Sequence, residues 1–200
     1  MNKVVVNKLT PALSSVLEEF RAEFRNRDRD GMHKFRYLGS GATATVYQLT
    51  NDLVVRVQTN QSYSKEAHLT WVKMSTSSRG RHFPRYFYAA EESGLARNAT
   101  VVVSVMEKLD SLGWDADRSH YNNSGIEGYL YCASKGIRTD SPVRVIRQGN
   151  LAGAYSRDSI ERVGRKAKAA ELDMVDVHSS NVMFRTENGR KTLVITDPVI

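Results

Sequence analysis

A short polar motif near the C-terminus carries the residue types that phosphoryl transfer requires. Asp176-Val177-His178-Ser179-Ser180-Asn181 follows a basic segment and leads into the apolar stretch Val182-Met183-Phe184. Asp176 can orient the proton of an attacking hydroxyl, while the carbonyl oxygen of Asn181, five positions later, can ligate Mg²⁺. The same hexapeptide also suits a polar loop in which Asp176 caps a turn and His178 is merely exposed.

A second carboxylate, Asp197, stands where an apolar strand is predicted to end. It follows Val194-Ile195-Thr196 and precedes Pro198, sixteen residues after Asn181. At that place it can supply a further ligand to a metal ion that bridges nucleotide phosphates. A solvated aspartate before proline in an ordinary turn would look the same in isolation.

Gly39-Ser40-Gly41 lies between two predicted strands, the second of which contains Val46. A glycine hairpin can fold over phosphates and donate backbone N–H groups, because no side chain obstructs the approach. Gly-Ser-Gly is also typical of an ordinary tight hairpin turn. No Gly-Lys-Ser or Gly-Lys-Thr follows the loop, which argues against a Walker-type phosphate loop.

The elements that must position these residues change character along the chain. Apolar residues at helical spacing predict an amphipathic helix from Pro11 to Arg27. A period of two and β-branched or aromatic composition predict strands, and one further helical stretch interrupts them. The predicted strands are Lys34–Leu38, Ala44–Leu49, Leu53–Gln58, Arg85–Ala89 and Thr100–Met106, with the helix at Ser62–Met74.

Beyond Leu109 the chain becomes mostly helical. Asp110–Gly125 is polar and predicted irregular, Ile126–Ser134 and Ser156–Leu172 are predicted helices, and Glu187–Arg190 is the turn of a closing β-hairpin. The sequence therefore predicts an α+β protein with two lobes. Residues 1–30 form a helical extension, 31–107 a β-rich nucleotide-binding lobe with one helix, and 108–200 a reduced helical lobe with the polar motif.

From roughly Lys34 to Pro198 the chain resembles the protein kinase-like superfamily. The resemblance lies in the order of the motifs: glycine loop, basic strand residue, linker, Asp-to-Asn motif, hairpin and aspartate. Asp176-x-His178-x-x-Asn181 has the form of the catalytic loop in its aminoglycoside-phosphotransferase-like and atypical branches. More narrowly, the chain resembles the early host-takeover serine/threonine kinases of T-seven-type lytic bacteriophages (Autographiviridae). The resembling stretches are Gly39 through Tyr47, Val54-Val55-Arg56-Val57, Asp176 to Phe184, and Ile195 to Val199.

By position, the resemblance implies that Asp176 is the catalytic aspartate and that His178 lies near the transferred phosphate. It implies Mg²⁺ ligation by Asn181 and Asp197, with ATP and Mg²⁺ as cofactors. Val105–Leu109 looks like the hinge that would bind adenine through its backbone. The residues implied in nucleotide binding are Gly39, Ser40, Gly41, Val46, Arg56, Glu66 and Glu107.

Two features depart from that pattern. Arg56 stands where the usual strand lysine pairs ATP phosphates with a helix glutamate, for which Glu66 is the candidate. A guanidinium is a broad planar fork, whereas an ammonium is a compact point charge, so catalytic geometry is less assured. No activation segment follows Asp197 in the sequence, so either a protein substrate docks elsewhere or the main task is binding.

The amino-acid composition limits which binding partners and which cellular compartment we expect. The 29 Lys and Arg exceed the 22 Asp and Glu, which suits an acidic or nucleic-acid-associated partner and equally suits solubility. The single cysteine, Cys132, cannot form an internal disulfide, as expected in a reducing host cytoplasm. Neither a signal peptide nor a membrane span is predicted.

Two basic stretches stand apart from the polar motif. Arg79–Tyr86 interleaves cations with aromatics, as nucleic-acid-binding segments do, although a loop entering a strand explains it as well. A later helix carries a second group of cations that is typical of a solvated face. These are Arg157, Arg162, Arg165, Lys166 and Lys168.

Three functions follow as hypotheses. The first is an ATP- and Mg²⁺-dependent serine/threonine kinase of a lytic phage that phosphorylates host proteins, such as RNA polymerase or RNA-processing enzymes, and thereby shuts off host transcription. The second is a pseudokinase-like module that binds and inhibits a host enzyme. The third is a small-molecule phosphotransferase, ranked last because a basic chain lacks the acidic groove that cationic substrates need.

Overall fold

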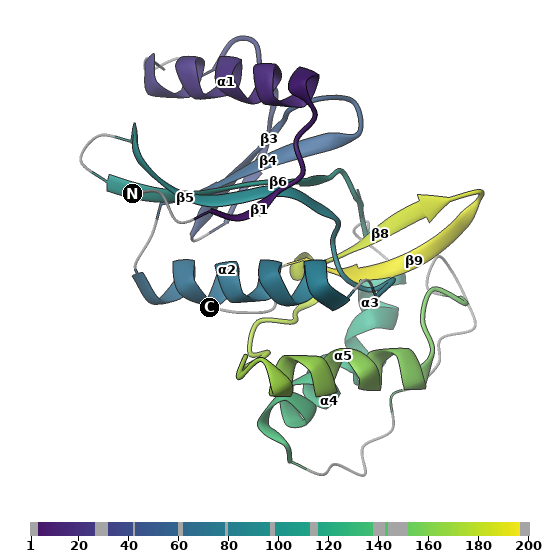
Figure 1. The fold of residues 1–200 in the computed structure, drawn as a ribbon. Helices are drawn as coiled ribbons and strands as arrows, with labels where there is room; N and C mark the ends of the chain where they lie inside the picture. Colours follow the sequence, from purple (N-terminus) through teal and green to yellow (C-terminus); the bar gives the residue numbers. More distant parts are fainter. Residues whose placement is uncertain are drawn as a thin grey trace. The chain divides into compact units, whose positions relative to one another are not determined.

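The computed structural model describes residues 4–26, 32–41, 43–59, 62–78, 80–96, 99–112, 116–137, 143 and 152–196 (Figure 1). In chain order the elements are β1 (Val4–Asn7), α1 (Pro11–Asn26), β2 (Tyr37–Ser40), β3 (Ala44–Gln48), β4 (Leu53–Gln58), α2 (Ser62–Ser78), β5 (Tyr86–Ala96), β6 (Ala99–Glu107), β7 (Asp110–Ser111), α3 (Ala116–Asn122), α4 (Ile126–Lys135), α5 (Arg157–Ala169), η2 (Ser179–Asn181), β8 (Val182–Glu187) and β9 (Arg190–Ile195). The predicted α+β class, β-rich first and helical with a closing hairpin later, is confirmed. Within the described ranges, no helix is both long and apolar enough to cross a bilayer.

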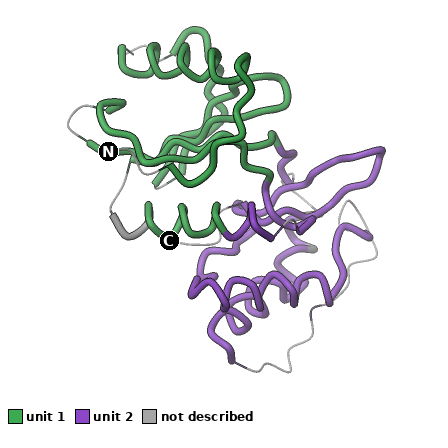
Figure 2. Tube along the Cα trace, viewed as in Figure 1, with its two compact units in different colours: residues 1–73, 85–108 green, residues 74–84, 109–200 purple. Residues whose placement is uncertain are grey.

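The chain divides into two compact units, coloured separately in Figure 2. Unit 1 comprises Met1–Lys73 and Arg85–Lys108, and unit 2 comprises Met74–Pro84 and Leu109–Ile200. The last turn of α2 and the loop after it therefore group with the later part of the chain. Each unit is described below by itself.

Unit 1 is built on a six-stranded antiparallel sheet in the order β1-β5-β6-β4-β3-β2. The predicted meander of β2, β3 and β4 is confirmed, and β4 then pairs with β6. The edge strand β1, which the sequence pattern missed, pairs with β5 across a register shift. Its four residues are too few for a period of two to stand out.

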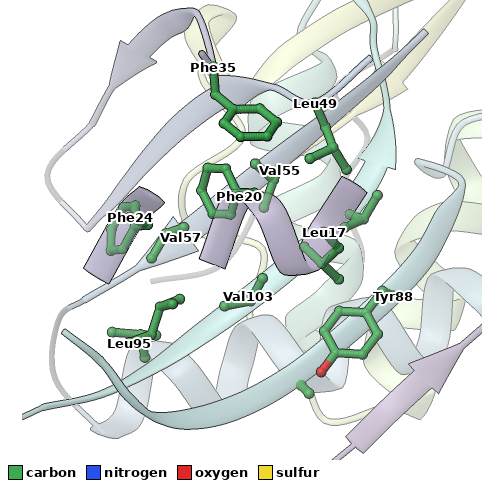
Figure 3. Packing of buried hydrophobic residues seen from close by; sticks show 13 residues of the cluster. Leu17, Phe20, Phe24, Phe35, Leu49, Val55, Val57, Tyr88, Leu95 and Val103 are labelled. Atoms are coloured by element: carbon green, nitrogen blue, oxygen red, sulfur yellow. The ribbon is translucent and has the colours of Figure 1, made fainter. Parts of the chain in front are cut away.

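The hydrophobic core of unit 1 lies between the sheet and α1. Odd-numbered residues of β4, Val55 and Val57, face the helix because successive side chains of a strand alternate between faces. From α1 come Leu17, Phe20 and Phe24, spaced to form one apolar stripe (Figure 3). The predicted N-terminal amphipathic helix is thus confirmed, with Pro11 at its first position, where proline is well tolerated.

A buried ionic cluster fixes α1 to β5 beside this core. The guanidinium of Arg21 donates two hydrogen bonds to the Glu92 carboxylate, one of them 3.0 Å long from Nε to Oε2. Tyr88 donates to Glu92 Oε1 at 2.8 Å, and the guanidinium also lies 5.2 Å from the centre of the Tyr88 ring. Burial alone would lower the pKa of Arg21, but the hydrogen bonds and charge of Glu92 outweigh it and leave the pKa raised.

The replacement Glu92→Gln should lower the free energy of unfolding by about 3 kcal/mol, because it removes the buried carboxylate that pairs with Arg21 and leaves only the exposed Glu18 as its counter-ion. Urea denaturation followed by circular dichroism measures this loss. The matched control is Glu91→Gln on the same strand, which we expect to change stability little. Equal losses in both variants would show that the Arg21–Glu92 pair does not fasten the helix.

Unit 2 combines a pair of packed helices with a small sheet in the order β7-β8-β9. Helices α4 and α5 approach closely at Gly164, where an added Cβ would lie 2.5 Å from the Cβ of Ala133. The predicted closing hairpin is confirmed. Its turn residues Asn188 and Gly189 have φ of 50° and 73°, the left-handed pair that a two-residue hairpin turn requires.

The stretch Asp110–Gly125 was predicted to be irregular, and this is wrong in part, because it contains β7 and the short helix α3. With only seven residues, α3 spans about two turns, too few for a helical period to show in the sequence. Tyr121 of α3 is 1% exposed and anchors the helix in unit 2.

The loop between α2 and β5 is bound to the β8–β9 hairpin within unit 2. The Nδ1–H of His82 donates to the Leu193 carbonyl at 2.6 Å, and the backbone N–H of Ile195 donates to the His82 carbonyl at 3.0 Å. Burial, followed by the positive charge of Arg81 and Arg185, lowers the pKa of His82 to about 4.

Because the pKa of His82 is lower in the folded protein than in the unfolded chain, its contribution to stability is present above about pH 6.5 and is lost toward pH 4. We expect the free energy of unfolding to fall by about 2 kcal/mol from this group between pH 7 and pH 5. Urea denaturation at both pH values, for wild type and His82→Asn, measures it. The variant should lose that share of the pH dependence, and an unchanged pH slope would contradict the assignment.

Candidate active site

The predicted Asp176–Asn181 loop lies in unit 2, between α5 and β8, and apolar residues hold it from beneath. Met174 and Val177 are 1% and 0% exposed, so the loop is anchored at two points in the core. The Tyr121 hydroxyl donates to the Val177 carbonyl at 2.6 Å, and the Met174 N–H donates to Ser134 Oγ at 3.1 Å. Burial raises the pKa of Tyr121, so its phenol stays protonated and available as a donor.

Asn181 closes this loop onto Asp176. Its side-chain Nδ2 donates to Asp176 Oδ2 at 2.8 Å and to the Asp176 backbone carbonyl, also at 2.8 Å. The Asn181 backbone carbonyl accepts hydrogen bonds from both the N–H and the hydroxyl of Thr196, each 2.9 Å long. The carboxylate and the amide that the motif predicted for one site are therefore brought together and fixed.

His178 occupies the tip of the loop and is 48% exposed at its side chain. Its Nδ1 accepts the Ser180 backbone N–H at 3.2 Å, which places the hydrogen of the neutral ring on Nε2. That Nε2 lies 3.1 Å from Asp176 Oδ1 and 3.3 Å from Asn181 Nδ2. Asp176 thus has a polar partner on each carboxylate oxygen, yet remains 31% exposed and accessible to a substrate hydroxyl.

The donor atoms present fit a hard cation such as Mg²⁺. Because Asn181 directs its Nδ2 at Asp176, its Oδ1 lies on the other side of the amide, and among the described residues this oxygen accepts no hydrogen bond. Carboxylate and amide oxygens are ligands that Mg²⁺ prefers. Asp197, the other predicted ligand, falls outside the described residues. Over those residues, no group of three or more His, Cys, Asp or Glu side chains forms a metal cluster.

Three predicted nucleotide-binding residues form one row across the sheet of unit 1. Gly39 of β2 pairs with Val46 of β3, Val46 pairs with Arg56 of β4, and Arg56 pairs with Ser104 of β6. Directly opposed residues of antiparallel strands share a face, so this row lies on the face opposite the α1 core. The structure therefore brings Gly39, Val46 and Arg56 onto a common surface of the sheet.

The glycine motif was predicted as a loop between strands, but Gly39 and Ser40 belong to β2 and only Gly41 follows the strand. The Gly41 N–H donates to the Ala44 carbonyl at 2.9 Å, and Ser40 Oγ accepts from the Tyr37 hydroxyl at 2.9 Å. A Cβ added at Gly39 or Gly41 would meet no atom within 4 Å. Packing within the protein therefore does not require glycine at either position. Close approach of a ligand to the backbone would explain both glycines.

Arg56 is buried at 7% exposure, and its Nη1 donates to Gln58 Oε1 at 2.6 Å. Glu66 is exposed on α2, and among the described residues no ion pair joins it to Arg56. The predicted Arg56–Glu66 pairing stays a prediction. From α2, His68 Nε2 forms a hydrogen bond with Ser104 Oγ on this face, at 3.0 Å.

Glu107 is buried at the end of β6. Its Oε1 accepts the Arg85 N–H at 2.8 Å, and its own N–H donates to the Arg85 carbonyl at 3.0 Å. The side chain thus secures the start of β5, and adenine binding by the backbone of Val105–Leu109 stays a prediction.

Sequence reasoning missed Gln58, Ser104, Tyr121 and Thr196. Only Gln58 left a signal, because it follows Arg56 by two residues and shares its face.

No family model matches the chain, and no curated protein matches it. Among solved structures, the chain is similar to APH(2″)-IIa in a ternary complex with streptomycin and ATP, at 13% identity and a TM-score of 0.38. The match covers 92% of this chain and 70% of that chain. At this TM-score the likeness in backbone path is loose, and nothing about activity or substrate is transferred from it.

Removing the hydroxyl in Tyr121→Phe should destabilise the loop from below, because the buried Val177 carbonyl loses its donor. We expect a loss of about 1–3 kcal/mol in the free energy of unfolding. Faster amide hydrogen exchange at His178 and Asn181 should accompany it. Tyr131→Phe, at a side chain 41% exposed on α4, is the control and should change neither quantity. Unchanged exchange in Tyr121→Phe would show that the hydroxyl does not hold the loop.

Proposed function

We propose that this chain is an ATP- and Mg²⁺-dependent phosphotransferase whose reaction centre is the Asp176–Asn181 loop. The observation that carries the proposal is the hydrogen bond between Asn181 Nδ2 and Asp176 Oδ2. It sets a carboxylate for the incoming hydroxyl beside an amide oxygen for a cation. Phosphoryl transfer depends mainly on such positioning and on charge stabilisation.

In this mechanism Asp176 accepts a hydrogen bond from the attacking hydroxyl and aims its oxygen at the γ-phosphorus. Asn181 and Asp197 would hold Mg²⁺, which would supply neutralisation of the charge on the phosphate oxygens. His178 directs its Nε2–H at Asp176, and the resemblance implies that this donor would turn to an oxygen of the transferred phosphate when substrate is bound. By the resemblance, Gly39-Ser40-Gly41 at the end of β2 and the Val46–Arg56 row would bind the nucleotide.

We propose serine or threonine hydroxyls of host proteins as the acceptor, in a lytic-phage kinase that acts on RNA polymerase or RNA-processing enzymes in the host cytoplasm. The resemblance of the motifs and the net charge of +7, which attracts acidic partners, support this choice. The hydrogen bond from Arg56 to Gln58 favours a second candidate, a pseudokinase-like module that inhibits a host enzyme by binding. An arginine engaged within the sheet is less free to hold phosphate.

Incubation of the purified chain with labelled ATP, Mg²⁺ and host lysate should label protein bands. Asp176→Ala and Asp197→Ala should each reduce the initial rate by about 100-fold or more, because they remove hydroxyl orientation and a metal ligand. Asp173→Ala is the matched control, since this nearby carboxylate forms a surface ion pair with Lys135. Its rate should stay within about twofold of wild type, as surface pairs contribute little.

The other functions give different results in the same assay. A lack of label, together with no thermal shift on adding ATP and Mg²⁺, would overturn phosphotransfer and favour the binding module. Label that appears only on an added small molecule would retain phosphotransfer but reject the protein substrate. Equal rates in wild type and both alanine variants would indicate a contaminating kinase.

A further inference from the structure

Unit 2 contains a pocket of about 150 Å³ that shares no residue with the Asp176–Asn181 loop. One wall is the loop Gly80 to Phe83, and the other is α5, through Ser159, Arg162, Val163 and Lys166. The two basic stretches that the sequence showed separately therefore meet here. Four of the five α5 cations are exposed, as predicted for a solvated face, and only Lys166 is partly buried.

Three cations line this pocket, and no acidic residue does. Arg162 has neither a hydrogen bond nor an ion pair with any described residue, and the nearby Glu161 is already paired with Arg165 at 2.6 Å. Arg81 uses its Nε on His82 Nε2, at 3.1 Å, which leaves its two terminal nitrogens without partners in the described chain. Lys166 donates to the Ser78 carbonyl at 3.0 Å and retains two further N–H donors.

His82, the buried residue of the pocket wall, does not neutralise the positive charge of the three cations. His82 is 3% exposed, and its two ring nitrogens are occupied by Leu193 and Arg81. Burial, together with the charges of Arg81, Arg185 and Arg162, keeps its pKa low and the ring neutral. The positive potential in the pocket is therefore left for a ligand to neutralise.

Size and burial select the kind of ligand. Pockets for drug-sized ligands have volumes of roughly 300–1,000 Å³, so 150 Å³ suits a single oxyanion group better than a whole nucleotide. Single-stranded nucleic acid binds by stacking bases on exposed aromatic rings. Here Phe83 and Tyr86 are 3% and 4% exposed and offer no such platform. Arginine forks and an ammonium are the usual partners of phosphate.

We propose that this pocket binds one phosphate group, held by Arg81, Arg162 and Lys166. Its source is either free inorganic phosphate or the phosphomonoester of a phosphorylated serine in a protein segment. The site is independent of the proposed phosphotransfer, because its residues lie outside the Asp176–Asn181 loop.

Calorimetric titration of the full-length chain with inorganic phosphate, at constant ionic strength adjusted with chloride, tests the site. We expect saturable binding that Arg162→Gln weakens by about tenfold, the effect of one lost charge-assisted hydrogen bond. Arg157→Gln removes the same charge from the same helix outside the pocket, leaves the Glu161–Arg165 pair intact and should keep wild-type affinity. Both arginines are exposed, so both variants should keep the wild-type melting temperature.

Three further ligands identify the source. Tighter binding of a phosphoserine peptide than of phosphate, with the same loss in Arg162→Gln, assigns the pocket to a phosphorylated protein segment. Equal affinities for the two assign it to free phosphate, and the unphosphorylated peptide should not bind. The proposal is overturned by absence of saturable phosphate binding or by equal weakening in both variants. It is also overturned if a single-stranded oligonucleotide binds tighter than phosphate and is insensitive to Arg162→Gln.

Discussion

The double role of the Asn181 side chain is the constraint on which the candidate active site depends. A carboxamide has one donor end and one acceptor end, and here the donor end is engaged by the side chain and backbone of Asp176. The acceptor end is thereby directed away and kept available to a cation. This arrangement holds only because Thr196 fixes the Asn181 backbone and Val177 and Met174 fix the base of the loop.

In the sheet of unit 1, the two faces likewise carry different side chains with different roles. In β4 the alternation of side chains sends Val55 and Val57 into the α1 core and sends Arg56 and Gln58 to the opposite face. Both polar side chains are almost fully buried, so each needs a hydrogen-bond partner, and they provide one for each other. Nucleotide binding at this face would have to compete with, or add to, that existing contact.

Local patterns made much of this fold predictable, and long-range contacts account for the rest. The α1 stripe, the β3–β4 alternation and the Asn188-Gly189 turn are properties of adjacent residues, and the structure confirms all three. The short elements β1 and α3 give too little period to detect. The Arg56–Gln58 bond could be foreseen from spacing, but Tyr121 under Val177 could not, since 56 residues separate them. The meeting of the two basic stretches likewise requires the tertiary fold.

The arginines of unit 2 have two different roles: one holds a loop in place, and two others line the pocket. Arg185 is 7% exposed, and its Nη1 and Nη2 donate to the backbone carbonyls of Arg81 and Phe83, at 2.8 Å each. It therefore uses its charge to hold the loop that carries Arg81. Arg81 and Arg162 keep donors that no described residue accepts, although their mutual repulsion makes the pocket electrostatically unfavourable when empty. A fold that fixes one guanidinium through carbonyl oxygens, and leaves two others without an acidic partner among the described residues, suits the anion binding proposed for this pocket.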